Sequence, residues 1–136
     1  MAQVTGTMVD LSPDQCRELL ITHRPRLGRL AFVDHGWPLV LPMNYYAEDR
    51  VIYFRTAAGS KLLAALRVQH VSFEIDHVDD VWQEGWSVLA LGRLRMLTDP
   101  DEIAEVNRAP LRAWAGGERP HFLRMDITSI SGRRIV

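Results

Sequence analysis

The residues best suited to chemistry lie in one short segment, where a strand-like run gives way to a helix-like one. Residues 54–61 read Phe-Arg-Thr-Ala-Ala-Gly-Ser-Lys, so a turn of small residues separates the arginine from the serine and lysine. The free N–H groups and positive dipole end of a helix start favour an anion. Arg55 can direct two donors at phosphate oxygens, Lys61 adds a charge, and Thr56 and Ser60 offer hydroxyls. The segment predicts a phosphate site, although a capped helix with two surface cations explains the same residues equally well.

The elements that must position this segment can be predicted from local patterns. Ser12, Pro13 and Gln15 form a capping box with proline at the first helical position, and the helix should end before Pro25. Two further helices are expected, over residues 60–67 and from residue 99 onward. Between them lie short β-rich runs, with turns expected at His35-Gly36 and at residues 47–50. The expected strands cover residues 28–34, 38–46, 51–56, 71–76, 86–97, and 122–127 with 130–136 as one strand or two.

This element order predicts an α+β, mainly β, fold in one domain covering residues 1–136. Six or seven short antiparallel strands, with two or three short helices at the connections, are typical of a closed or split β-barrel. They do not fit a parallel, doubly wound sheet. No internal repeat or linker divides the 136 residues.

Composition excludes several classes of function. The 16 Lys and Arg residues are balanced by 17 Asp and Glu residues, which disfavours a nucleic-acid binder held by phosphate neutralisation. Cys16 is the single cysteine, so it can form no disulfide within the chain and no cysteine-based zinc cluster, and we expect it to be an inert buried thiol. The five histidines have no metal-ligand spacing, so no metal site is predicted. With no signal peptide and no apolar run of about 20 residues, we expect a cytoplasmic protein without a membrane partner.

Two other features have both a functional and a plain structural explanation. The acidic stretch at residues 74–80 could supply paired carboxylates, but we interpret it as a strand end followed by a solvated loop. Trp82 and Trp86 could be core residues, but we expect them to line a cleft or a subunit interface.

A second motif gives the phosphate segment a family context. The segment is preceded by a strand that reads Pro42-Met43-Asn44-Tyr45, and this combination resembles the pyridoxamine 5′-phosphate oxidase-like, FMN-binding split-barrel superfamily. The resemblance is closest to the small single-domain branch that includes the nitroimidazole-resistance proteins. It is supported by residues 28–31, 85–88, 92–93 and 132–135, and so extends over most of the chain.

The resemblance implies a cofactor site that can be assigned to individual residues. In such proteins the FMN phosphate is held by residues matching Arg55, Thr56, Ser60 and Lys61. The flavin ring lies beside residues matching Pro42, Asn44 and Tyr45. Residues such as Trp86 and Ser87 contact flavin held mainly by the other subunit, because a two-fold homodimer builds the cleft.

The implied function is a flavin-dependent oxidoreductase that transfers electrons or hydride to a small organic acceptor. No catalytic residue is predicted, because the flavin supplies the reactive atom. The Arg-Leu-Ser-Pro-like C-terminal segment of authentic pyridoxamine 5′-phosphate oxidase is absent, so vitamin B6 oxidation ranks lower. Two alternatives are a deazaflavin-dependent reductase and a non-catalytic module that binds flavin or haem. An acidic deazaflavin tail would need further cations, which the chain could supply from Arg24, Arg26, Arg67 or Arg133.

Overall fold

The computed structural model describes residues 6–57, 62–111 and 120–136 of the chain. It contains three helices: α1 (Pro13–Thr22), α2 (Leu62–Val68) and α3 (Pro100–Asn107). In the part of the chain that is described, no helix is long and apolar enough to cross a membrane. The strands are β1 (Met8–Leu11), β2 (Leu27–Asp34), β3 (Trp37–Asn44), β4 (Tyr46–Glu48), β5 (Val51–Ala57), β6 (His70–Asp79), β7 (Glu84–Met96) and β8 (Pro120–Ile135).

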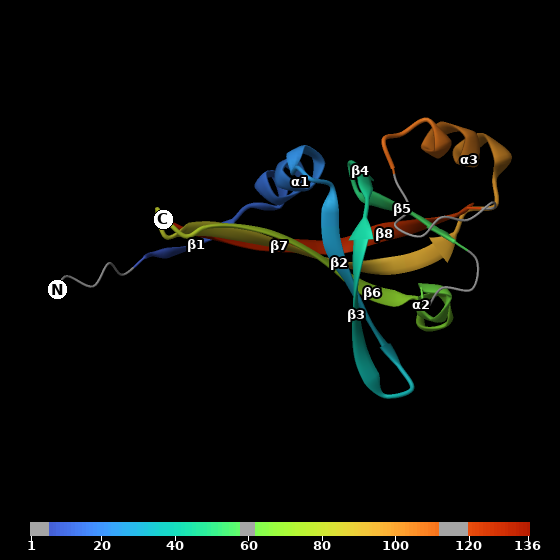
Figure 1. Cartoon of the computed structure of the whole chain (residues 1–136), viewed down its shortest axis with the longest axis horizontal. Coiled ribbons are helices and arrows are strands. Elements are labelled where there is room, and N and C mark those ends of the chain that lie inside the picture. Colours follow the sequence, from blue (N-terminus) through green and yellow to red (C-terminus); the bar gives the residue numbers. More distant parts are fainter. Residues whose placement is uncertain (1–5, 58–61, 112–119) are drawn as a thin grey trace.

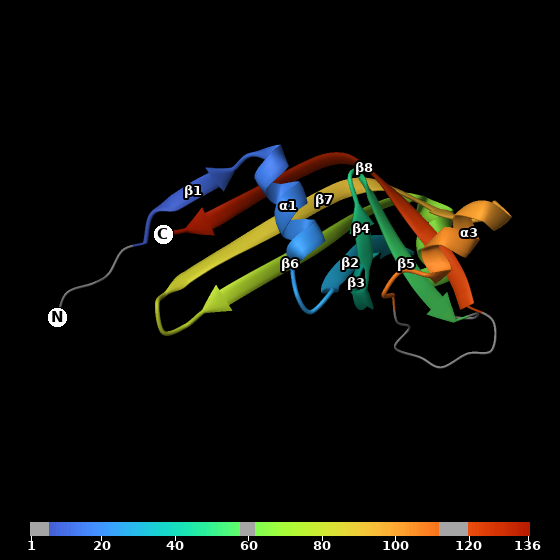
Figure 2. The ribbon, with the colours of Figure 1, turned by 90° about the horizontal axis from the view of Figure 1, so that it is seen from above.

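All eight strands belong to one antiparallel sheet. Its order is β3-β2-β6-β7-β8-β5-β4, and β1 pairs with the end of β8. The long strands β6, β7 and β8 extend toward the two chain termini, whereas α2 and α3 lie at the opposite end (Figures 1 and 2). The expected mainly β fold with short connecting helices is therefore confirmed.

The main core lies on the inner face of this curled sheet, which we define as the face against which α1 and α2 pack. Alternate residues of each strand point into it, as the two-residue period of a strand requires. Cys16 and Leu20 of α1, and Leu62 and Ala65 of α2, are fully buried against it. The expectation of a buried Cys16 is confirmed, and burial raises the pKa of its thiol despite the nearby charge of Arg17.

A smaller core lies on the opposite, outer face, beneath α3. The buried members of this second cluster come from β5, β8, α3 and the segments flanking α3: Tyr53, Leu97, Val106, Leu111 and Phe122. Asp99 caps α3 by accepting a hydrogen bond from the Asp101 backbone N–H. One part of the outer face is therefore covered by a helix, while the rest of it carries exposed side chains.

Several structures predicted from local sequence patterns are present. The Ser12 capping box is present, α1 ends at Thr22, and the His35-Gly36 turn has positive φ at both residues. Strand β1 was not predicted, because four residues reading Met-Val-Asp-Leu carry no turn or period signal of their own.

One strand boundary differs from expectation, and the structure decides another that the sequence left open, each for a tertiary reason. Residues 38–46 are not one strand, because the chain leaves the β2 ladder at Tyr45, whose hydroxyl donates to the Leu20 carbonyl at 2.7 Å. Conversely, β8 continues through Thr128 as a bulge: Ser129 faces Leu91 and Ile127 faces Gly92, which leaves Thr128 unpaired in the register. Its hydroxyl donates to the Leu91 carbonyl at 3.0 Å.

The bulge depends on Gly92. A Cβ at this position would lie 2.1 Å from the Asp126 carbonyl oxygen, a backbone atom that cannot turn aside. We expect Gly92→Ala to lower the free energy of unfolding by roughly 1–3 kcal/mol, as overpacked sites do. Urea unfolding would measure this loss, with Ser131→Ala on the exposed side of β8 as the control. Equal stability of the two variants would contradict this interpretation of the bulge.

Candidate functional site

Most of the residues predicted to bind the cofactor are distributed over the two faces of the sheet. Residues directly opposite in an antiparallel pair share a face, so the register assigns each one. Pro42 and Asn44 of β3 lie on the outer face with Arg29, and Ser87 lies there opposite Arg133. Arg55 also lies on the outer face, opposite Phe122 at the far end of β8.

Arg55 is the predicted residue whose environment is most informative. Its guanidinium carbon lies 5.8 Å from the centroid of the Phe122 ring, over the ring face. Its Nε atom is buried and has no hydrogen-bond partner among the described residues. A buried cationic donor without an acceptor is unfavourable, and an anion beside it would remove that cost. The geometry therefore fits a phosphate at the end of β5.

The other predicted phosphate residues are placed differently. Thr56 follows Arg55 on β5, so its side chain lies on the opposite face, 7% exposed and across from His121. Ser60 and Lys61 lie outside the described residues. Arg55 is therefore the charged member of the predicted phosphate site for which the structure gives a position.

Tyr45 and Trp86 lie on the inner side of the sheet. Tyr45 is 1% exposed, packs edge-on against Phe73, and its burial raises the pKa of the hydroxyl to about 12. Its side chain therefore belongs to the core of the subunit rather than to a cleft beside a ring. Trp86 is partly buried. Its ring packs edge to face with the ring of His23, and the two ring centroids are 5.2 Å apart. Burial and the neighbouring His77 lower the pKa of His23.

The outer face carries an open hollow near the chain termini. An open hollow of about 840 Å³ runs across β1, β6, β7 and β8, and both Trp86 and Ser87 contribute to its lining. A second hollow, of about 450 Å³, lies on the same face over β2, β3, β6 and β7. The predicted contact of Trp86 and Ser87 with a flavin stays a prediction, and Trp82 lies elsewhere, 73% exposed in the β6–β7 connection.

Two acidic side chains that line the larger hollow, Glu74 and Asp76, form a charged cluster with an arginine that the sequence did not place beside them. Glu74 and Asp76 are neighbours on the outer face of β6, and Arg29 Nη1 donates to both, at 3.0 and 3.1 Å. Burial, followed by the hydrogen bond to Asp76 and the charge of Asp76, raises the pKa of Glu74 to about 7, although Arg29 opposes this. The interpretation of residues 74–80 as a strand end and loop is therefore confirmed at 74–76 and wrong at 77–79, which still form part of β6. A Glu-x-Asp spacing inside a strand was the available signal.

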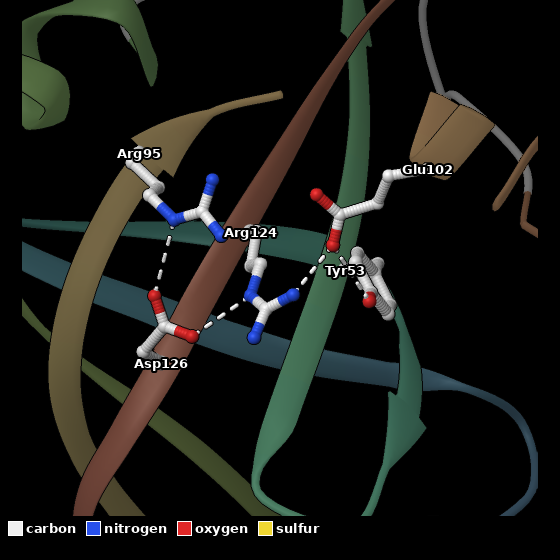
Figure 3. Close-up of polar contacts among 5 residues, drawn as sticks. All are labelled: Tyr53, Arg95, Glu102, Arg124 and Asp126. Carbon is white, nitrogen blue, oxygen red and sulfur yellow. Dashed lines mark hydrogen bonds and ion pairs between the residues drawn. The ribbon is translucent and has the colours of Figure 1, made fainter. Parts of the chain in front are cut away.

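A network of polar contacts fastens α3 to the sheet next to Arg55 (Figure 3). Glu102 of α3 accepts hydrogen bonds from Arg124 Nη1 and, at 3.3 Å, from the Tyr53 hydroxyl. Asp126 accepts from Arg124 Nε at 2.8 Å and from Arg95 Nε at 3.3 Å. Tyr53 and Arg124 face each other two residues along the ladder from Arg55 and Phe122, so this network joins α3 to the part of the sheet that carries Arg55.

Within residues 6–57, 62–111 and 120–136, no group of three or more His, Cys, Asp or Glu side chains could hold a metal ion.

Comparison with known proteins agrees with this architecture. A curled antiparallel sheet with two helices packed against its inner face is the architecture of a split-barrel domain. The chain belongs to the pyridoxamine 5′-phosphate oxidase family, whose model matches residues 12–134. The resemblance drawn from the sequence is therefore confirmed.

Three solved structures illustrate the relationship. An FAD-binding protein from Mycobacterium smegmatis is 35% identical, with a TM-score of 0.79 over 93% of this chain and 98% of that one. An FAD-binding protein from Mesorhizobium loti is 25% identical, with a TM-score of 0.82 over 97% and 99% of the two chains. A putative 5-nitroimidazole antibiotic resistance protein from Bacteroides thetaiotaomicron, 15% identical, shares the fold with a TM-score of 0.76 over 97% and 90%.

The Glu74 carboxyl predicts a specific pH dependence of stability. Because the folded state raises its pKa, protonated Glu74 stabilises the fold: this contribution is complete below the pKa of an unfolded glutamate and is lost as pH rises through about 7. Between pH 5 and pH 8, the wild-type free energy of unfolding should therefore fall relative to that of Glu74→Gln. Urea unfolding at a series of pH values measures the difference, and Glu105→Gln, an exposed change on α3, is the control. Parallel pH profiles for wild type and Glu74→Gln would refute the assignment.

Proposed function

We propose that this chain is a flavin-binding oxidoreductase that holds FMN by its phosphate and transfers electrons or hydride to a small organic acceptor. The flavin would supply the redox chemistry, and the protein would bind and orient it. Arg55 would hold the phosphate from the end of β5, together with Ser60 and Lys61, whereas the Thr56 side chain lies on the opposite face of the sheet. Pro42 and Asn44 from one subunit, and Trp86 and Ser87 from the other, would lie beside the ring.

The observation that carries this proposal is the buried, unpartnered Nε of Arg55. Phe122 supports the flat side of the guanidinium, and the Glu102 network keeps α3 over the same part of the sheet. This support reduces the freedom that Arg55 would lose on binding, and a guanidinium fork suits the paired oxygens of a phosphate.

The relatives described above support a flavin cofactor, and whether it is FMN or the longer FAD remains to be tested. Two proteins of the same fold, 35% and 25% identical to this chain, are described as FAD-binding. FAD contains the whole of FMN, so a site built around the first phosphate suits either cofactor. Titration of FMN, FAD and a deazaflavin against the same protein would rank the three. Turnover of a nicotinamide donor with nitroaromatic or quinone acceptors would separate an enzyme from a binding module.

The proposal includes a homodimer formed through the outer face. Four apolar side chains between 40% and 59% exposed lie together on β2, β3 and β7: Val33, Val40, Leu89 and Leu91. Both hollows are on this face, and neither encloses a ligand by itself. A second copy related by a two-fold axis would cover the apolar side chains and close each hollow into a cleft.

Replacing Arg55 tests the phosphate contact. We expect Arg55→Gln to weaken FMN binding about tenfold to a hundredfold, because charge-assisted hydrogen bonds contribute about 1.5–3 kcal/mol. Riboflavin has the same ring and no phosphate, so its affinity should change less than twofold. Fluorescence titration gives both dissociation constants. An equal loss for riboflavin and FMN, or no loss for FMN, would contradict the assigned role.

Replacing Leu89 tests the dimer. A charge at this position would be buried without a partner in the proposed interface, so Leu89→Glu should convert a particle of twice the chain mass into a monomer and weaken flavin binding. Sedimentation analysis measures the mass. Val81→Glu places the same charge in the exposed β6–β7 connection and should leave the dimer intact. A wild-type protein that sediments as a monomer would exclude this part of the proposal.

A further inference from the structure

Three arginines gather on the outer face of β7 and β8, where repulsion should keep them apart. Arg95 lies directly opposite Arg124 in the register, and Arg93, on the same face of β7, lies opposite Asp126. Like charges directly opposite each other across two strands destabilise a sheet. We call Arg93, Arg95 and Arg124 the arginine strip.

The carboxylates nearby occupy only part of the strip. Asp126 accepts from the Nε atoms of both Arg95 and Arg124, and Glu102 accepts from Arg124 Nη1. In Figure 3 no dashed line joins either terminal nitrogen of Arg95 to another of the residues drawn. The Arg95 side chain is 50% exposed, and Arg93 is exposed with no side-chain hydrogen bond or ion pair to any residue that the structure describes. Three cations therefore share two carboxylates, and the side chains of Arg93 and Arg95 are accessible to solvent.

The strip is separate from the position proposed for the first phosphate. Arg55 lies opposite Phe122, so reaching Arg95 takes two steps across the sheet and two residues along β8. With standard strand spacings these two backbone positions are roughly 12 Å apart. A single phosphate bound at Arg55 would therefore not reach the arginine strip as well.

We propose that the arginine strip is a second anion site, which binds a phosphate or carboxylate group distinct from the phosphate at Arg55. The forked donors of Arg95 and the free charge of Arg93 bind the anion, and Asp126 and Glu102 hold Arg124 and Arg95 in position. The anion belongs either to the part of a flavin cofactor beyond its first phosphate or to an anionic co-substrate. This assignment extends the proposed function, but the site itself can be tested without flavin.

Inorganic pyrophosphate is a suitable probe. In the full-length protein, the ¹H–¹⁵N signals of the Arg95 and Arg124 Nε–H groups should shift as pyrophosphate is added, because these groups lie at the site. The double variant Arg93→Gln/Arg95→Gln should raise the dissociation constant at least about tenfold, since two charged donors are removed. It leaves Arg124 to pair with both carboxylates, so the fold is retained. Arg108→Gln, which removes an exposed charge at the end of α3, is the matched control and should change binding less than twofold.

The outcomes separate the two sources of the anion from failure of the proposal. If the double variant loses FAD affinity and keeps FMN affinity, the anion is the second phosphate of the cofactor. If it keeps both and loses only pyrophosphate and a reduced nicotinamide dinucleotide, the anion belongs to a co-substrate. Unshifted Arg95 and Arg124 signals, or equal pyrophosphate binding by the double variant and Arg108→Gln, would overturn the second site. A wild-type protein that binds pyrophosphate here but no flavin would refute only the proposed function.

Discussion

The buried Nε–H donor of Arg55 is the constraint on which the functional interpretation depends. A guanidinium is among the most costly groups to bury, and this one has an aromatic ring beneath it but no acceptor for Nε among the described residues. The second hydrophobic cluster and the Glu102 network hold the surrounding strands and α3 together. The packing of this region therefore offsets the cost of burying this donor without an acceptor among the described residues.

Strand β8 connects the separate parts of the site. One end of it faces Arg55, its middle carries Arg124 and Asp126, and its far end borders the larger hollow. The bulge at Thr128 matters here, because one extra residue shifts the alternation of the strand: Arg124 and Asp126 lie on the outer face before the bulge, and Ser131 and Arg133 lie there after it. A sheet that also pairs β1 with this strand end presents a long outer surface that two subunits could share.

Local sequence signals predicted the parts of the fold that local chemistry determines. Ser12 and Gln15 were sufficient to place α1, and His35-Gly36 to place a hairpin turn. Features that need a distant partner were missed: the break at Tyr45 depends on the Leu20 carbonyl, and the Glu74–Asp76 pair depends on Arg29, 45 residues from Glu74. At the site, Arg55 was identified by its type and place in the sequence. The face of the sheet on which each of the other predicted site residues lies could be determined only from the strand register.

The central claim is that Arg55 and its surroundings bind a flavin phosphate as a dianion. The most direct measurement is the ³¹P NMR signal of FMN in the presence of excess protein, followed from pH 5 to pH 8. The bound signal should be distinct from that of free FMN and should titrate at lower pH, since a nearby guanidinium favours the dianion. Riboflavin should not compete with that signal as strongly as FMN does. A phosphate that titrates as it does in free FMN, although the ring is bound, would contradict the claim.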